Sequence, residues 1–427
     1  MKLKISNFAK IKEAEIIVDG ITVIAGENNT GKSTIGKILF CLFNSISNIE
    51  EKIANQRIKE IERTCRTILQ NSPLNIINRN SSVRNMNNLA HRIASQFKYH
   101  IIKKVKLSSS KIHDTISSIL SKIDISMPDD LVDSMTERIT SIVDLSEEYI
   151  TIELLNRYFN NVFHNQMNSF FENDCNAELQ LVIKEKKVDI TISDNSCIDF
   201  SSEIAIMHNA IYIDNPFIID SLSSFNYFNS MDGFLKDLLT YASEDNIIDG
   251  IIESVLVKEK LNEIYQTIQS VVHGKVIQKQ DEYYLEGEDF SQPIYLSNLS
   301  TGLKSFIIIK MLLEKGCIKE KDVLVLDEPE IHLHPQWQVV YAELIVLLQK
   351  HFDLSIIVAT HSPYFLDAIN LYSIKHGVDK KVNYYLSSIE NNRVKMNLVT
   401  DSIDLIYNKM ASPIQILDSL RYDLNNN

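Results

Sequence analysis

Glycine and proline, the residues that turn a polypeptide most sharply, are scarce in this sequence: 11 glycines and 8 prolines occur in 427 residues. A low content of both disfavours a protein built from many short strands and tight turns, and it favours long helices. Apolar residues make up 44% of the chain and charged residues 23%, as is typical of a globular protein with a sizeable core. The length predicts two to three domains.

Cysteines are also few, and they lie far apart in the sequence. The five are Cys41, Cys65, Cys175, Cys197 and Cys317. They form no Cys-x-x-Cys pair, which argues against a structural zinc site and against a disulfide framework. Scattered cysteines are typical of proteins of the reducing cytosol, so we expect a cytoplasmic protein.

Long hydrophobic runs are missing. No segment reaches the run of about 18 apolar residues that is needed to cross a bilayer. Lys2 and Lys4 are followed by no uninterrupted apolar stretch of the kind found in a secretion signal. We therefore expect no membrane partner.

Acidic residues are absent from Arg63 to Lys111, although the whole chain carries a net charge of −13. The window holds ten cations, which are Arg63, Arg66, Arg79, Arg84, Arg92, Lys98, Lys103, Lys104, Lys106 and Lys111. Such a basic window is a candidate contact for nucleic acid or another polyanionic partner. The alternative, a solvated helical surface that happens to be basic, stays open.

A glycine-bounded segment, Gly26–Thr34, fits the pattern G-x-x-x-x-G-K-[ST] at every fixed position. The apolar run Ile21–Ala25 before it predicts a buried strand, and Ile35–Phe40 after it begins a helix with apolar residues three to four apart. A strand, such a loop and a helix in this order form the context in which the loop binds phosphate. The alternative is a glycine turn before an ordinary helix.

Backbone N–H groups of this loop are expected to point inward at the helix N-terminus and to bind phosphate oxygens. Lys32 is predicted to reach the β- and γ-phosphates, and the Ser33 hydroxyl to bind Mg²⁺. The predicted cofactors are therefore ATP and Mg²⁺. The candidate nucleotide-binding residues here are Gly26, Asn28, Asn29, Thr30, Gly31, Lys32, Ser33 and Thr34.

Two further apolar runs end in residues suited to phosphoryl transfer. Val323–Leu326 is followed at once by Asp327, a candidate ligand of Mg²⁺, and by Glu328, a candidate base for the attacking water. Leu354–Ala359 is followed closely by His361, whose imidazole can contact the γ-phosphate or the water. Singly, a solvated acidic turn or a capping histidine explains these residues. Their combination with a phosphate-binding loop favours catalytic roles for Glu328 and His361.

The triplet Ser300-Thr301-Gly302 opens a predicted helix and offers a second anion-binding N-terminus. A single chain does not need two such helix ends to bind one γ-phosphate. Two chains that face each other head to tail do need them, because each nucleotide then meets one helix end from each chain. Ser300 and Gly302 are therefore candidate nucleotide contacts between two copies of the chain.

The order of the predicted elements places these motifs in one α/β domain that is split by a helical insertion. Residues 1–44 read as a hairpin, the strand before the loop and the helix after it. Residues 45–172 switch to apolar spacings of three and four, which predict amphipathic helices, the last of them from Tyr149 to Phe171. Residues 173–427 return to strand patterns, with one hairpin over 176–192 and a closing hairpin and helix.

Four motifs together resemble the Walker A, signature, Walker B and switch-histidine motifs of ABC-type ATPases. They are Gly26–Ser33, Leu299–Leu303, Leu326–Pro329 and His361. The signature reads L-S-T-G-L where the common pattern is L-S-G-G-Q. With D-E-P-E-x-H-L-H-P and T-H-S-P, the set is similar to SMC-like and OLD-like AAA ATPases of bacterial DNA repair and phage defence. The resemblance implies a P-loop ABC/SMC-like head, a mixed sheet with flanking helices, which forms a homodimer or higher oligomer around ATP. It also implies that Ser300 and Gly302 contact the ATP that Lys32 of the other copy holds.

OLD-type relatives carry a C-terminal Toprim nuclease, but no Asp-x-Asp pair follows His361 and no HNH or other metal-nuclease cluster is found in the sequence. The resemblance is therefore strongest to the PtuA-like ATPase subunits of Septu-type defence systems and to ATPases that accompany retrons. It implies a separate nuclease partner, of HNH type by analogy. Three alternatives are an SMC-like DNA-repair ATPase, a nucleotide-gated scaffold with little turnover, and the nucleotide subunit of a membrane transporter. The insertion and the signature weigh against the transporter.

Overall fold

The computed structural model describes residues 1–71, 83–122, 127–172, 175–223, 230–240, 261–280, 282–288 and 290–425. The chain forms two compact units, one of Met1–Ser47 with Leu155–Asn427 and one of Asn48–Leu154. The second unit lies within the insertion that the sequence predicts over 45–172. The structure places residues 155–172 in the first unit, together with the predicted segments 1–44 and 173–427.

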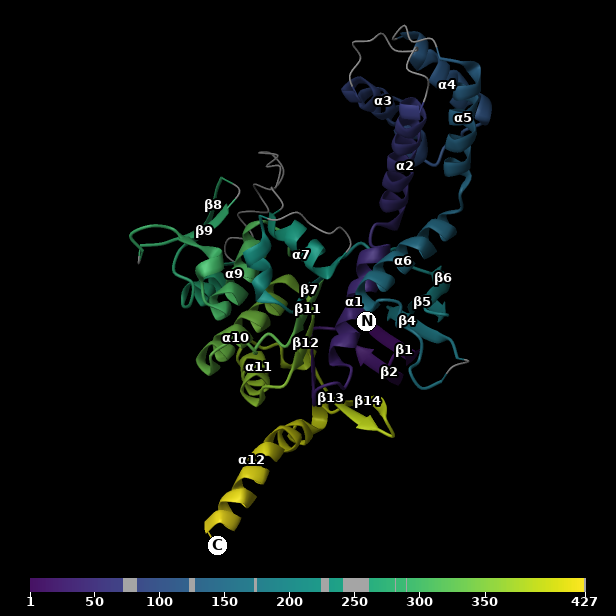
Figure 1. Ribbon diagram of the computed structural model, residues 1–427. Helices are drawn as coiled ribbons and strands as arrows, with labels where there is room; N and C mark the ends of the chain where they lie inside the picture. The colour runs from purple at the N-terminus through teal and green to yellow at the C-terminus, as the bar shows by residue number, and fades with distance from the viewer. Residues whose placement is uncertain are drawn as a thin grey trace. The chain divides into compact units, whose positions relative to one another are not determined.

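A mixed sheet of eleven strands forms the centre of the first unit in the described part of the chain (Figure 1). The strand order is β6-β5-β4-β1-β2-β14-β13-β3-β12-β11-β7. The strands are β1 (Lys2–Phe8), β2 (Ile11–Ile17), β3 (Ile21–Gly26), β4 (Ala177–Ile183), β5 (Lys186–Ser193), β6 (Ser196–Ser202), β7 (Ala210–Ile213), β11 (Val323–Asp327), β12 (Ser355–Thr360), β13 (Val382–Glu390) and β14 (Arg393–Leu398). The predicted α/β class, a mixed sheet with flanking helices, is confirmed.

Five neighbouring strands, β13, β3, β12, β11 and β7, run parallel to one another. Every residue of β3 and of β12 is buried. This is the pattern of parallel strands covered on both faces, which appear in the sequence as continuous apolar runs. Because the strands are parallel, their carboxyl ends meet at one edge of the sheet. The residues that follow β3, β11 and β12 are therefore brought together.

Helix α1 (Lys32–Ile46) packs on one face of this parallel part. A Cβ added at Gly36 would lie 2.4 Å from Val325 Cγ1 and 3.1 Å from the Tyr212 ring. No such atom can be accommodated there, so the glycine permits the helix to approach β7 and β11 closely. This approach holds the phosphate-binding end of α1 against the carboxyl edge of the sheet.

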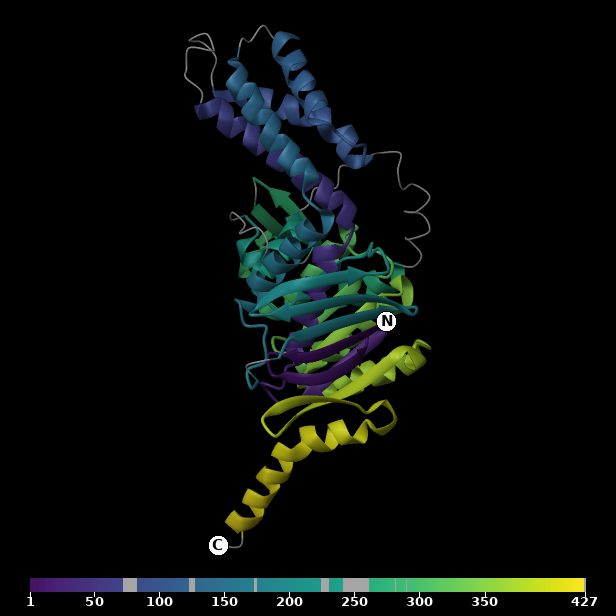
Figure 2. The same cartoon turned by 90° about the vertical axis from the view of Figure 1, so that its right-hand side faces the viewer.

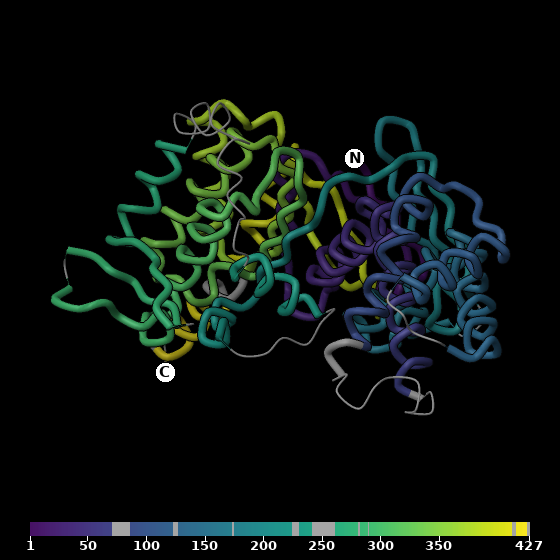
Figure 3. Tube along the Cα trace, turned by 90° about the horizontal axis from the view of Figure 1, so that it is seen from above, coloured from purple at the N-terminus to yellow at the C-terminus, as the bar shows by residue number. Residues whose placement is uncertain are grey.

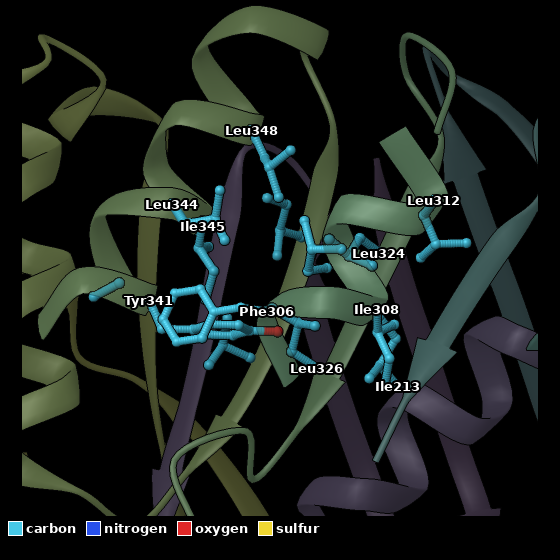
Figure 4. Close-up of a cluster of buried hydrophobic side chains, with 14 of the residues drawn as sticks. Ile213, Phe306, Ile308, Leu312, Leu324, Leu326, Tyr341, Leu344, Ile345 and Leu348 are labelled. Atoms are coloured by element: carbon cyan, nitrogen blue, oxygen red, sulfur yellow. The ribbon is translucent and has the colours of Figure 1, made fainter. Parts of the chain in front are cut away.

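Three helices cover the opposite face (Figure 1). They are α9 (Thr301–Glu314), α10 (Pro335–Phe352) and α11 (Pro363–Lys375). Phe306 and Tyr341 meet edge to face with ring centroids 5.0 Å apart, in one buried cluster with Leu324 and Leu326 of β11 (Figure 4). This core fixes β11, the strand that carries Asp327, from the side opposite α1.

The remaining strands extend the sheet in antiparallel fashion, in teal and purple in Figure 2. The hairpin predicted over 176–192 is confirmed as β4 and β5. A third strand, β6, follows it, which the sequence analysis did not predict because Cys197 is its one buried residue. This antiparallel part joins the rest of the sheet by a parallel pairing of β2 with β14, through Ile11 with Val394 and Glu13 with Lys395.

The two C-terminal strands lie inside the sheet, between β2 and β3, and their yellow trace lies beside purple trace in Figure 3. β13 pairs in parallel with β3, so that Val382 lies opposite Ile21 and Ser387 opposite Gly26. The predicted closing hairpin and helix are confirmed as β13, β14 and α12 (Asp404–Asn425).

Helix α6 (Glu147–Phe163) ends earlier than the sequence predicts, since Phe171 was expected to close it. His164 and Asn165 follow with φ angles of 52° and 59°, which are left-handed and end the helix. The aromatic residues beyond Phe163 continue an apolar pattern, so the pattern alone does not mark this stop.

The second unit, taken by itself, is built from helices packed around an apolar core. Its complete helices are α2 (Ile49–Asn71), α3 (Val83–Ile102), α4 (Ser109–Lys122) and α5 (Asp129–Asp144). Ile61, Cys65, Ile112, Ile116 and Ile139 are fully buried in this core. The amphipathic helices predicted from the three-and-four spacing are confirmed at these positions.

A small second sheet and short helices complete the first unit. The sheet contains β8 (Lys275–Lys279), β9 (Glu282–Glu286) and β10 (Ile294–Tyr295). Between β7 and β8 in the sequence, α7 (Met231–Thr240) and residues 261–269 are helical, whereas 224–229 and 241–260 lie outside the described residues.

Candidate nucleotide-binding site

The loop between β3 and α1 is wound by backbone conformations that few side chains tolerate. Gly26, Asn29 and Gly31 have positive φ angles of 151°, 65° and 75°. A Cβ at Gly26 would lie 2.4 Å from the carbonyl oxygen of Ser387 on β13. Gly31 directly precedes α1, a helix of 15 residues. The loop therefore stands at the N-terminus of a helix, where backbone N–H groups have no partner within the helix.

Lys32 reaches back across this loop. Its Nζ donates to the carbonyl oxygens of Gly26 at 3.1 Å and Glu27 at 2.7 Å. The residue is 4% exposed. Burial lowers the pKa of the Lys32 ammonium, while the nearby carboxylates of Glu328 and Asp327 oppose that shift. An ammonium with three donors can exchange these carbonyls for phosphate oxygens.

Asp327, at the end of β11, is held at both carboxylate oxygens. Ser33 Oγ donates to Oδ1 at 3.0 Å, and the Tyr212 hydroxyl donates to Oδ2 at 2.6 Å. Tyr212 lies on β7 and is buried. Burial and the charge of Asp327 raise the pKa of the Tyr212 hydroxyl well above its ordinary value, so the hydroxyl stays a donor. The serine after Lys32 and the aspartate thus meet as the sequence predicts.

Glu328 and His361 meet across the ends of β11 and β12. His361 Nε2 lies 2.6 Å from Glu328 Oε1, and the Glu328 backbone N–H donates to the Ala359 carbonyl at 2.9 Å. Glu328 has a φ of 51°, a left-handed conformation that is unusual for a residue with a long side chain. Such strained residues concentrate at functional sites.

A second glutamate, Glu330, joins the loops that follow these two strands. Its Oε1 accepts from Thr360 Oγ1 at 2.6 Å, from the His361 N–H at 2.7 Å and from the Ser362 N–H at 3.2 Å. Glu330 is 5% exposed, and this burial raises the pKa of its carboxyl group. Gln338 of α10 supports the same loop by accepting from Ser362 Oγ at 2.7 Å.

A pocket of about 330 Å³ lies along the phosphate-binding loop. From the predicted set it is lined by Asn29, Thr30, Gly31, Lys32, Ser33, Thr34 and Glu328. Asn28 is exposed on the loop, and Thr30 is buried, with its hydroxyl 2.6 Å from Ser387 Oγ. Lys10, from the turn between β1 and β2, also lines the pocket and donates to Asn29 Oδ1 at 2.5 Å.

Ser300 and Gly302 do not line this pocket. Ser300 is exposed and directly precedes α9. Gly302 packs closely on Trp337, because a Cβ added at this glycine would lie 3.0 Å from the tryptophan ring. The structure therefore brings together the loop residues, Asp327, Glu328 and His361, and leaves the signature residues elsewhere on the same unit.

Three residues beside this site, Tyr212, Glu330 and Lys10, are not predicted from the sequence. A tyrosine inside the apolar run Ala210–Ile213 is a usable signal, because a buried hydroxyl requires a partner. Glu330 also gives a signal, because it is a third acidic residue in the short stretch Asp327–Glu330 that follows an apolar run. Lys10 gives none, since its position beside the loop depends on the pairing of β1 with β2.

A phosphate-binding loop with its lysine and serine, and an acidic pair and a histidine on the adjacent strand ends, define an ATPase of the P-loop class. The model of the AAA ATPase domain family matches residues 1–366, and the chain belongs to this family. It is similar to the Septu protein PtuA of Bacillus thuringiensis, with 28% identity over 193 residues. That match spans 42% of this chain and 47% of the PtuA chain, so it covers about half the length of this relative.

Similar solved structures are SMC heads, each at 12% identity. The SMC head domain from Thermotoga maritima gives a TM-score of 0.38, with 93% of this chain and 98% of that chain covered. The SmcHead bound to the C-winged helix domain of ScpA gives 0.43, with coverage of 93% and 97%. None of the described helices combines the length and apolar composition needed to cross a membrane.

Proposed function

We propose that this chain binds ATP with Mg²⁺ and hydrolyses it. The loop Gly26–Thr34 would hold the phosphates through its N–H groups, and Lys32 would exchange its two carbonyl partners for phosphate oxygens. The Ser33 hydroxyl and the Asp327 carboxylate, 3.0 Å apart, are hard oxygen donors of the kind that Mg²⁺ prefers. The residues present therefore fit the cofactors that the AAA ATPase family implies.

The observation that carries the proposal of hydrolysis is the contact of 2.6 Å between Glu328 and His361 beside the loop. Glu328 lines the pocket and would take a proton from the attacking water. His361 would orient Glu328 and contact the γ-phosphate. Both residues stand at the carboxyl edge of the parallel sheet, the edge at which open α/β sheets bind ligands.

We also propose that two copies enclose ATP between them. Ser300 is exposed at the start of α9 and lies outside the pocket of its own chain, so it is available to a nucleotide held by another copy. Gly302 behind it allows the close packing against Trp337 that fixes this helix start. A homodimer or a higher oligomer built from such pairs is the assembly proposed.

Glu328→Gln tests this function because it keeps the size of the side chain and removes the base. We expect ATP hydrolysis to fall about 100-fold or more, while ATP binding is kept and dimers accumulate in ATP and Mg²⁺. Phosphate release, nucleotide titration and light scattering measure these effects. Glu343→Gln is the matched control, since Glu343 also contacts a histidine, His376 Nε2 at 3.1 Å, outside the site. Wild-type hydrolysis by Glu328→Gln would contradict the assignment.

The similarity to the Septu protein PtuA supports a role in antiphage defence, in which this ATPase would regulate a separate nuclease, of HNH type by analogy. The alternatives are an SMC-like DNA-repair ATPase and a nucleotide-gated scaffold with little turnover. Purification of the Glu328→Gln variant from its host in ATP and Mg²⁺ separates them. A co-purifying small nuclease supports the defence role. Little steady-state ATP turnover by the wild-type chain, both with and without nucleic acid, identifies a scaffold.

A further inference from the structure

The pocket beside the phosphate-binding loop is lined by two chemically different sets of residues. Lys10, Lys32 and Lys37 supply cations, whereas Val162, Phe163 and Phe170 supply an apolar wall. Gln166 lines the same pocket. A nucleotide combines the same two characters, since it joins an anionic triphosphate to a flat, aromatic base.

The apolar wall is formed by the last residues of α6 and by the segment after it, and backbone hydrogen bonds fix that segment to the turn between β1 and β2. Ala9 N–H donates to the Met167 carbonyl at 2.9 Å, and Phe170 N–H donates to the Ala9 carbonyl at 2.9 Å. Asn195 adds support from the turn between β5 and β6, because its Oδ1 accepts from the N–H groups of Met167 and Asn168 at 2.8 and 2.9 Å. The segment after α6 is thus held by hydrogen bonds to two turns of the sheet, the turn between β1 and β2 and the turn between β5 and β6.

The two phenylalanines of the wall differ in how they are held. Phe163 packs edge to face on Phe8, with ring centroids 4.9 Å apart, and stacks on Phe159 at 6.0 Å. Phe170, in contrast, is 50% exposed although hydrogen bonding fixes its backbone. A half-exposed aromatic ring on an ordered wall, next to a phosphate-binding loop, has the features of a surface on which a base stacks.

We propose that Phe170 is the base-stacking residue of this site and that Gln166 reads the edge of the base as adenine. This inference rests on the proposed ATP binding and adds to it the part of the site that selects the nucleotide. A glutamine amide offers one donor and one acceptor, which match N6–H and N7 of adenine. Guanine presents two acceptors, O6 and N7, on that edge, so the amide cannot satisfy both.

Titration calorimetry on the full chain with three probes tests the proposal. The probes are AMPPNP, GMPPNP and inorganic tripolyphosphate, each with Mg²⁺. Base stacking on an aromatic side chain is worth about 1–3 kcal/mol, so Phe170→Ala is expected to weaken AMPPNP binding by about 5- to 150-fold. Tripolyphosphate has no base, and its affinity should stay at the wild-type value. Phe170→Trp should restore AMPPNP binding.

Phe171→Ala is the matched control, because Phe171 is the neighbouring aromatic residue, is 45% exposed and does not line the pocket. Gln166→Ala should reduce the preference for AMPPNP over GMPPNP while tripolyphosphate binding is unchanged. Unaltered AMPPNP affinity in Phe170→Ala would overturn the stacking role, and so would an equal loss of tripolyphosphate binding. If the wild-type chain binds none of the three probes, the proposed function itself fails.

Discussion

Asp327 shows how a single residue in this site is fixed. One of its carboxylate oxygens accepts from Ser33 and the other from Tyr212, so the side chain has no freedom to rotate away. Tyr212 is only 2% exposed, so bulk water does not compete with Asp327 for its hydroxyl group. Tyr212 is therefore a positioning residue for the proposed Mg²⁺ ligand.

Tyr212→Phe removes this hydroxyl and keeps the ring that packs under α1. We expect the Mg²⁺ concentration that gives half-maximal ATP hydrolysis to rise about 10- to 100-fold, because a charge-assisted hydrogen bond of about 1.5–3 kcal/mol is lost from Asp327. A Mg²⁺ titration at saturating ATP measures it. Tyr341→Phe is the control, a buried tyrosine of the core that does not contact Asp327. Equal Mg²⁺ dependence in both variants would remove Tyr212 from the site.

At this scale the sequence predicts what is local. The loop residues follow from one contiguous motif, and Asp327 and Glu328 from the end of one apolar run. The bond from Tyr212 to Asp327 joins residues 115 positions apart, and the bond from His361 to Glu330 joins residues 31 apart. Such partners are set by the pairing of β7, β11 and β12, which a single sequence does not specify.

At the scale of elements, Glu330 links the loop after β11 to the loop after β12. Three donors from Thr360, His361 and Ser362 converge on one buried oxygen of Glu330. This arrangement holds the start of α11 and, with it, the imidazole that contacts Glu328. The two strand ends therefore act as one rigid block.

Glu330→Ala and Glu330→Gln separate this role from a general loss of structure. The alanine variant removes the acceptor that three donors share, so we expect ATP turnover at saturating ATP to fall about 10- to 100-fold. The glutamine variant retains an acceptor oxygen and should keep most of the turnover. Steady-state kinetics on both variants measures the difference. A Glu330→Ala enzyme with wild-type turnover would refute the link.

The same pair of variants has a pH signature. Burial raises the pKa of Glu330 above its ordinary value of 4.5, so the folded chain holds this proton to higher pH than the unfolded chain. The folded state then binds more protons between the two pKa values, and its stability falls as the pH rises through that window. Glutamine does not titrate, so the melting temperature of Glu330→Gln should decline less with pH above 4.5.

Buried strands were predicted from the sequence, whereas an exposed strand was missed. β3, β11 and β12 were predicted because parallel strands covered on both faces are apolar at nearly every residue. β6 was missed because it is an exposed edge strand without alternation. The excess length predicted for α6 has a different cause, two left-handed residues that the apolar pattern does not reveal.

At the scale of the whole molecule, charge is divided between segments. The chain has a net charge of −13, yet Arg63 to Lys111 contains no acid. Acids outside that window neutralise part of it, since Lys104 pairs with Glu50 at 3.0 Å and with Glu147 at 3.1 Å. Within the described residues, Lys103 and Lys106 have no ion pair and are exposed. The window thus retains cations that can meet phosphate.

Reversal of Lys103 and Lys106 to Glu tests the proposed contact with nucleic acid. We expect weaker binding of duplex and single-stranded oligonucleotides and a salt slope that is reduced by about two, because each lost phosphate contact lowers it by about one. Fluorescence anisotropy at several salt concentrations measures both. Reversal of Lys319 and Lys321, exposed and outside the window, changes the net charge equally and serves as control. Unchanged affinity would leave the window a solvated basic surface.

The placement of β13 beside β3 has a consequence for biosynthesis. The strand that precedes the phosphate-binding loop is bonded to β12 and β13, both of which lie beyond residue 354 of the 427. Both hydrogen-bonding edges of β3 therefore stay open on the ribosome until β12 and β13 have been synthesised, and open strand edges promote aggregation. We expect nascent chains of this protein to need protection of these edges, because the strand that carries the phosphate-binding loop is complete on both sides only once β13 has left the exit tunnel.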